Sequence, residues 1–113
     1  MRYMLLIYSN ENIQLSDKEQ QALYQEYGAF TQEVQANGVY EAGDPLHTTE
    51  AATTVRVREG ASAQTDGPFA ETKEQLGGYY ILNCETLDEA IGYAAKIPTA
   101  KNGSIEVRPL LEM

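Results

Sequence analysis

The sequence predicts an α+β fold of the ferredoxin-like type, in which two helices cover one face of an antiparallel sheet. The chain divides into two weakly similar halves, and each half runs from a strand through a helix to a strand. A segment with the alternation of a β-hairpin is inserted between the halves. Two βαβ-like units with an inserted hairpin give the order βαβ-ββαβ. The 113 residues fit one domain, so we expect residues 1–113 to fold as a single unit.

The first half starts with a strand and continues with a long helix. Residues Tyr3–Tyr8 are nearly all apolar, which suits a strand in the interior of a sheet. Ser16 and Glu19 have the spacing of a capping box, so a helix is predicted from there to about Ala36. Its buried stripe is predicted from apolar side chains that recur at helical spacing, namely Leu23, Tyr27, Phe30 and Val34.

Residue types that break regular structure follow this helix. Asn37-Gly38 is typical of a helix end with a left-handed cap. Residues 39–42 are predicted to form a short strand, which the turn-forming sequence Gly43-Asp44-Pro45 ends.

The inserted hairpin is predicted from alternation of apolar and polar residues. Residues 53–58 are rich in β-branched side chains and place Arg56 and Arg58 together on one face of a strand. Glu59-Gly60 suits a tight turn, and residues 61–65 would form the returning strand.

The second half repeats the first in outline. Residues 78–84 are predicted to form another core strand, and Thr86 and Glu89 repeat the capping-box spacing. Pro98 is expected to end the helix, because proline disfavours helical backbone in the preceding residue. Residues 104–108 form the last predicted strand. The inner face of the second helix is predicted to consist of Leu87, Ala90, Ile91, Ala94 and Ala95.

The second face of the sheet has no predicted element to cover it. The simplest way to bury this face is a homodimer in which two sheets pack face to face. The sequence therefore predicts a dimeric α/β barrel.

Composition narrows the classes of partner. The formal net charge of −9 argues against nucleic acid and against an anionic membrane surface, although one or two local cations could still hold a small anionic ligand. No apolar run is long enough to span a bilayer, and the first residues lack the features of a signal peptide. The single cysteine, Cys84, fits a reducing compartment, so we expect a cytoplasmic protein with no membrane segment.

The segment 66–80 is the most informative stretch for function, because a loop dense in ionisable groups leads directly into an apolar strand. Asp66 is a candidate catalytic base, or it forms an Asx turn. Lys73 lies between Glu71 and Glu74 in the sequence and is a candidate proton-transfer group or an anchor for a carboxylate. The alternatives are weak solvated ion pairs of about 0–1 kcal/mol each, or a contact across the dimer.

Three other residues are of types that can take part in catalysis or binding. His47, the only histidine, is a general base or an ordinary rim residue; no further ligands cluster with it, so no metal site is predicted. Arg56 would require a carboxylate or an anionic ligand if it faced the dimer interior. Cys84 is predicted to be a core residue. No nucleophile elbow and no glycine-rich phosphate loop is present, so no cofactor is predicted.

Several segments together carry a resemblance to a known family. The longest is Asp66-Gly67-Pro68-Phe69-Ala70-Glu71-Thr72-Lys73-Glu74, and the others are residues 3–8, 42–43, 54–56 and 106–109. With these segments the chain resembles the YCII-related family, in its DGPF-domain branch. The resemblance implies a dimeric α/β barrel. It also implies a functional role for the long block, in which Asp66 and Lys73 are the catalytic candidates and Phe69, Glu71 and Glu74 the ligand-binding candidates.

One feature of many YCII-related proteins is missing. They resemble one another in pairing two residues. One is a histidine of the first helix, and the other is an aspartate that precedes a proline near the end of the second helix. Tyr27 occupies the histidine position in this chain, and Ile97, just before Pro98, occupies the aspartate position. The acid–base chemistry that the resemblance implies for this dyad therefore does not carry over. Tyr27 either donates a hydrogen bond into a cavity or packs in the core.

Two main functions follow from these observations. The first is binding or transformation of a small anionic organic molecule by proton transfer or elimination, since some proteins with a similar fold are dehydrochlorinase-type lyases. The cavity would lie between sheet and helices and be lined by Tyr27, Phe30, Tyr79 and Arg56, with Asp66 and Lys73 at its mouth. The alternative, which the resemblance implies, is a non-catalytic regulatory or interaction protein linked to sigma-factor control of transcription. A third reading makes the loop only a clasp of the dimer.

Overall fold

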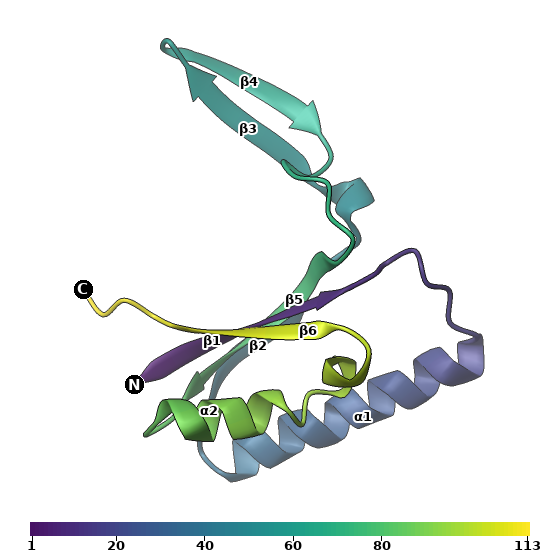
Figure 1. Cartoon of the computed structure of the whole chain (residues 1–113), viewed down its shortest axis with the longest axis vertical. Coiled ribbons are helices and arrows are strands. Elements are labelled where there is room, and N and C mark those ends of the chain that lie inside the picture. Colours follow the sequence, from purple (N-terminus) through teal and green to yellow (C-terminus); the bar gives the residue numbers. More distant parts are fainter.

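The computed structural model describes all 113 residues. Helices α1 and α2 lie side by side below one face of a sheet, and a long hairpin rises from the sheet on the other side (Figure 1). The elements are β1 (Arg2–Ser9), α1 (Asp17–Ala36), β2 (Tyr40–Pro45), the 3-10 helix η1 (Thr49–Ala51), β3 (Thr53–Arg58), β4 (Ala61–Asp66), β5 (Gln75–Asn83), α2 (Leu87–Ala94), the 3-10 helix η2 (Pro98–Lys101) and β6 (Ser104–Pro109).

The main sheet has four strands in the order β2-β5-β1-β6, and every neighbouring pair is antiparallel. In the centre of the sheet, Leu5 of β1 pairs with Tyr80 of β5 on one side and with Val107 of β6 on the other. This order, with both helices on one face, is the ferredoxin-like arrangement, so the predicted fold class is confirmed. The predicted hairpin forms a separate two-stranded sheet of β3 and β4.

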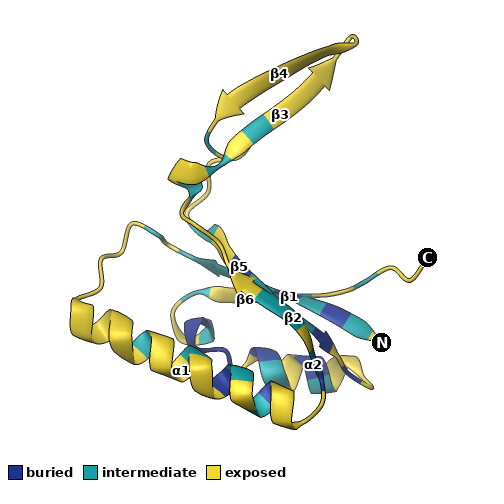
Figure 2. Ribbon diagram, turned by 180° about the vertical axis from the view of Figure 1, so that it is seen from behind, coloured by how far each residue is buried: buried dark blue, intermediate teal, exposed yellow.

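The core lies between the helices and one face of the sheet. Alternate residues of β1 are buried, and Leu5 and Leu82 from the two central strands are completely inaccessible to solvent. Helix α1 contributes Phe30 and Val34, both near its carboxyl end. Figure 2 shows that the amino-terminal half of α1 is largely exposed. Helix α1 is therefore attached to the core through one half of its length.

Local signals fix both ends of α1. Ser16 and Glu19 form the predicted capping box, since each side chain accepts a hydrogen bond from the other residue's backbone N–H. At the other end Gly38 has φ +73°, and the N–H groups of Gly38 and Val39 donate to the carbonyls of Gln35 and Val34. This pattern is a Schellman cap, which requires a left-handed residue and therefore favours glycine.

The prediction for the inner face of α2 was partly wrong. Ala90 and Ala94 are buried as expected, but about half of Leu87 and Ile91 is exposed, and Ala95 is also exposed. The fully buried side chains of this short helix are thus two methyl groups, and Tyr93 packs against the core while partly buried.

Two predicted strand boundaries were also wrong. Strand β2 continues to Pro45, beyond the predicted end at residue 42, and β5 starts at Gln75 and not at residue 78. Strand β2 is at the edge of the sheet, where a proline is tolerated because an outward N–H has no partner strand. A shift in register between Tyr40 and Ala42 lets β2 continue through Gly43.

Residues 53–66, which we call the arm, form the predicted hairpin and extend away from the main sheet (Figure 1). Glu59 and Gly60 both have positive φ, as a type I′ turn requires. Val55 and Val57 are on one face of the arm and are 57% and 60% exposed. The radius of gyration is 16.0 Å, whereas a compact chain of this length has about 13 Å. The arm therefore has no packing partner within the chain.

The face of the main sheet opposite the helices is also uncovered, and we call it the open face. The residues of β1 and β5 that alternate with the buried ones point toward it; they include Met4, Leu6, Tyr79 and Ile81, all partly exposed. Its margin on β6 carries the ion pair of Glu106 and Arg108. The centre of the open face is apolar, as the sequence predicts. Neither helix has the length and hydropathy needed to cross a membrane.

Candidate functional site

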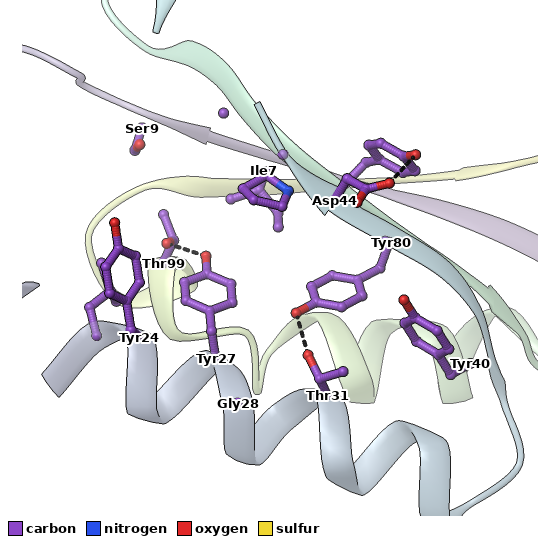
Figure 3. A pocket seen from close by; sticks show the side chains of 16 residues that line it. Ile7, Ser9, Tyr24, Tyr27, Gly28, Thr31, Tyr40, Asp44, Tyr80 and Thr99 are labelled. Carbon is purple, nitrogen blue, oxygen red and sulfur yellow. Dashed lines mark hydrogen bonds between the residues drawn. The ribbon is translucent and has the colours of Figure 1, made fainter. Parts of the chain in front are cut away.

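A cavity of about 410 Å³ lies between the middle of α1 and the main sheet, and we call it the α1 cavity. One wall is the middle of α1, from Leu23 to Thr31; the other walls come from β1, β2 and β5, with Thr99 of η2 at one end. Figure 3 shows tyrosine side chains that project into this space from both the helix and the sheet. The cavity opens where α1 is no longer packed against the core.

Glycines allow the close approaches that shape this cavity. A Cβ at Gly43 would lie 2.7 Å from the ring of Tyr80, so only glycine lets β2 pass so close to that ring. A Cβ at Gly28 on α1 would meet nothing within 4 Å. Gly28 therefore borders free space, whereas Gly43 is in tight contact.

Tyr27 is held by a residue far away in the sequence. Its hydroxyl shares a hydrogen bond of 2.5 Å with Oγ1 of Thr99, which is 91% buried (Figure 3). Burial of the Tyr27 hydroxyl raises its pKa above the ordinary value of 10.0. Tyr27 is therefore a neutral phenol at physiological pH, and it can donate a hydrogen bond.

A second pair of hydroxyl groups lies one turn further along α1. Oγ1 of Thr31 and the hydroxyl of Tyr80 are 2.9 Å apart (Figure 3). The ring of Tyr80 packs edge-to-face against Phe30, with ring centroids 5.1 Å apart. Burial also raises the pKa of Tyr80. The side chain is fixed by both its ring and its hydroxyl.

The α1 cavity contains little charge. Asp44 is the only carboxylic acid in its lining, and no lysine, arginine or histidine lines it. The hydroxyl of Tyr79 donates to Oδ2 of Asp44 at 3.2 Å, and this hydrogen bond raises the pKa of Tyr79. The lining thus offers aromatic rings, hydroxyl groups and one carboxylate at the edge.

The sequence predicted a cavity between sheet and helices, and the structure contains one. Of its predicted lining residues, Tyr27 and Tyr79 border the α1 cavity, whereas Phe30 lies in the core behind Tyr80. Arg56 is exposed on the arm. Asp66 and Lys73 are not at the mouth of this cavity within one chain.

The loop after the arm borders a different hollow of about 610 Å³, which we call the arm-base hollow. Phe69 and Glu74 line it together with His47, which comes from the connection between β2 and η1. Phe69 is 79% exposed, and Oε1 of Glu74 accepts a hydrogen bond from Ser104 at 2.7 Å. The predicted ligand-binding residues are therefore not brought together: two line the α1 cavity, two line the arm-base hollow, and Arg56 and Glu71 line neither.

The two catalytic candidates have no partner within the chain. Asp66 ends β4 and its carboxylate accepts no hydrogen bond; the turn that follows it relies on Gly67, at φ +96°. The Asx turn considered for Asp66 is thus not formed. Lys73 and Glu71 are exposed and form no ion pair. Four cations of the chain have no ion pair within it, and they are Lys18, Arg56, Arg58 and Lys73.

Thr99, Thr31 and Tyr80 are the site residues that sequence reasoning missed. One signal pointed to Thr99, because the missing dyad links position 27 with the residue before Pro98. The structure brings these segments together, but Ile97 is buried and the contact from Tyr27 is made by Thr99. No three His, Cys, Asp or Glu side chains are grouped so that they could hold a metal ion.

The raised pKa values of Tyr27 and Tyr80 predict a loss of stability in alkali. Above about pH 10 the unfolded chain releases these protons while the folded chain keeps them, so the free energy of unfolding falls as pH rises. Urea unfolding followed at a series of pH values should show this fall. The double substitution Tyr27→Phe/Tyr80→Phe should make it shallower, and an unchanged slope would contradict the assignment.

Comparison with known proteins agrees with the fold. The chain is 38% identical over 114 residues to the uncharacterised protein R00369 of Rhizobium meliloti (strain 1021), and the match covers 97% of this chain and 92% of that protein. A solved structure that it resembles is 5-chloro-2-hydroxyhydroquinone dehydrochlorinase (TftG) from Burkholderia phenoliruptrix AC1100, in complex with 2,5-dihydroxybenzoquinone. That similarity has a TM-score of 0.56 and covers 100% of this chain and 96% of the other at 15% identity, so it bears on the fold alone. The family described as YCII-related domain matches residues 1–113, and the chain belongs to that family.

Proposed function

We propose that this protein binds a small, uncharged organic molecule in the α1 cavity. The observation that carries the proposal is a hollow of about 410 Å³ lined by aromatic rings and hydroxyl groups that are already held in place. Cavities of roughly 300–1,000 Å³ with a mostly apolar lining and a few fixed polar groups are typical of small-molecule sites. The quinone bound to the dehydrochlorinase of similar fold is also a small ring compound.

The lining favours an uncharged ligand over the anionic one expected from the sequence. An anion entering the α1 cavity would lose hydration, meet no cation and approach the carboxylate of Asp44. An uncharged molecule would avoid this penalty and could still accept hydrogen bonds. An anionic ligand would require cations from outside the α1 cavity, such as Arg56 or Lys73 of a second copy.

The chemistry supported by this lining is binding and orientation. Neutral Tyr27 can donate a hydrogen bond to a carbonyl oxygen, which would fix and polarise that group. A base of the histidine type is missing from the cavity. The predicted catalytic roles of Asp66 and Lys73 therefore depend on a second copy that brings them to a ligand.

A thermal-shift screen with a matched pair of variants tests the location of binding. Leucine at Gly28 would fill part of the α1 cavity, and leucine is about 1 kcal/mol better than glycine inside a helix, so folding should not suffer. Gly92 on α2 has similar free space but lies outside the cavity. An uncharged compound that raises the Tm of wild type should do so in Gly92→Leu and not in Gly28→Leu. Equal shifts in both variants would place the ligand elsewhere.

We also propose that the protein acts as a homodimer. The open face is apolar at its centre, and an isolated two-stranded hairpin such as the arm is only marginally stable in water. The spacing and rise of the strands give the open face and the arm together a flat area of roughly 600 Å² per copy. The projecting side chains add to this area. The total is close to the ~800 Å² that each partner buries in a standard interface. A second copy would cover both surfaces by symmetry.

Light scattering on the protein as it elutes from a size-exclusion column measures the mass of this assembly. Wild type should have twice the 12.5 kDa mass of the chain. Ile81→Lys places a charge in the centre of the open face and should shift the mass toward the monomer. The control Ile91→Lys changes a half-exposed position of α2, on the other side of the sheet from the open face, and this variant should stay dimeric. A wild-type mass equal to one chain, or a dimeric Ile81→Lys variant, would contradict a dimer formed through this face.

A further inference from the structure

Two pairs of hydroxyl groups border the α1 cavity, and each pair joins α1 to another element. Tyr27 on α1 is bonded to Thr99 on η2, and Thr31 on α1 is bonded to Tyr80 on β5. Positions 27 and 31 are one helical turn apart, about 6 Å along the axis. Figure 3 shows the two tyrosine rings side by side between helix and sheet, where they come from opposite walls.

Counting hydrogens shows what the pairs can offer to a ligand. Each pair contains two hydroxyl hydrogens, and its internal bond uses one of them. One hydrogen per pair remains free to donate. The raised pKa values of Tyr27 and Tyr80 keep both phenols protonated at physiological pH.

Both pairs are also held firmly by their surroundings. The ring of Tyr80 lies against Phe30 and against the backbone at Gly43, where a Cβ would come within 2.7 Å. A Cβ at Gly103 would lie 2.8 Å from Cγ2 of Thr99, so glycine is required there for the chain to pass behind that threonine. Donors that are fixed before binding cost little ordering entropy when a ligand arrives.

We propose that the α1 cavity selects uncharged ligands that present two hydrogen-bond acceptors, such as two carbonyl oxygens, on opposite sides of a ring-sized apolar body. This inference rests on the proposed function and names the class of ligand that the cavity takes. One acceptor meets the Tyr27–Thr99 pair and the other meets the Thr31–Tyr80 pair. All four hydroxyl groups line the same cavity, so one ring-sized ligand with a carbonyl at each end can reach both pairs.

Two cyclic ketones of similar size test the inference. Cyclohexane-1,4-dione has two acceptors on opposite sides of the ring, and cyclohexanone has one. Titrations followed by NMR should give wild type a Kd for the dione that is about fivefold to tenfold lower, the factor expected for one additional hydrogen bond.

Conservative variants assign the preference to the two pairs. The double variants Tyr27→Phe/Thr99→Val and Thr31→Val/Tyr80→Phe each keep the side-chain shapes and remove both hydroxyl groups of one pair, so in either variant the Kd ratio of the two ketones should approach one. Tyr93→Phe is the matched control, because the Tyr93 hydroxyl is bonded to Asn37 outside the cavity. It should keep the wild-type ratio.

The outcomes separate this inference from the function on which it rests. If wild type binds both ketones equally, and Gly28→Leu weakens both, the cavity is a ligand site and the two-acceptor selection is wrong. If the preference survives in both double variants, the hydroxyl pairs do not cause it and the inference is also wrong. If neither ketone binds wild type, the selection and the proposed uncharged ligand are both overturned.

Discussion

The attachment of α1 to the sheet through its carboxyl half is the constraint on which the candidate site depends. Phe30 and Val34 anchor that half in the core, and the capping box at Ser16 keeps the rest helical although it contacts little. The amino-terminal half of α1 extends beyond this anchor without buried residues and does not pack against the sheet. The α1 cavity occupies the resulting gap. A helix that began only at its buried residues would have left no wall for a ligand.

The site and the proposed assembly use opposite faces of the same sheet. Alternation along β1 and β5 sends Leu5 and Tyr80 toward the helices and Leu6 and Tyr79 toward the open face. The hydrogen bond from Tyr79 to Asp44 lies where the two regions meet. The backbone of the sheet would therefore separate a second copy on the open face from the α1 cavity. The part of the second copy able to reach toward the cavity is its arm, which carries Arg56 and Arg58 without ion pairs.

Features that depend on neighbouring residues could be predicted from the sequence, and features that depend on distant contacts could not. Short stretches of sequence determine the caps of α1, the turn at Glu59-Gly60 and the alternation of the arm. These features were predicted correctly. The bond between Tyr27 and Thr99 joins residues 72 positions apart, and no local pattern encodes it. The exposure of Ile91 has the same origin, because helical spacing marks an apolar stripe but not how much of it the sheet covers. The direction of the arm also follows from tertiary geometry, and it carries Asp66 away from the mouth of the cavity, where the sequence predicted it.

Entry of a ligand into the space beside α1 is the central claim, and glycine amide signals in NMR spectra report on this entry directly. Gly28, Gly43, Gly77 and Gly78 line the α1 cavity, whereas Gly60, Gly67 and Gly92 lie on the arm, just after it and on α2. Titration with cyclohexane-1,4-dione, or with any stabilising compound from the screen, should shift the first group and leave the second unchanged. Shifts confined to Gly60 and Gly67 would contradict the account, because they would place binding at the arm.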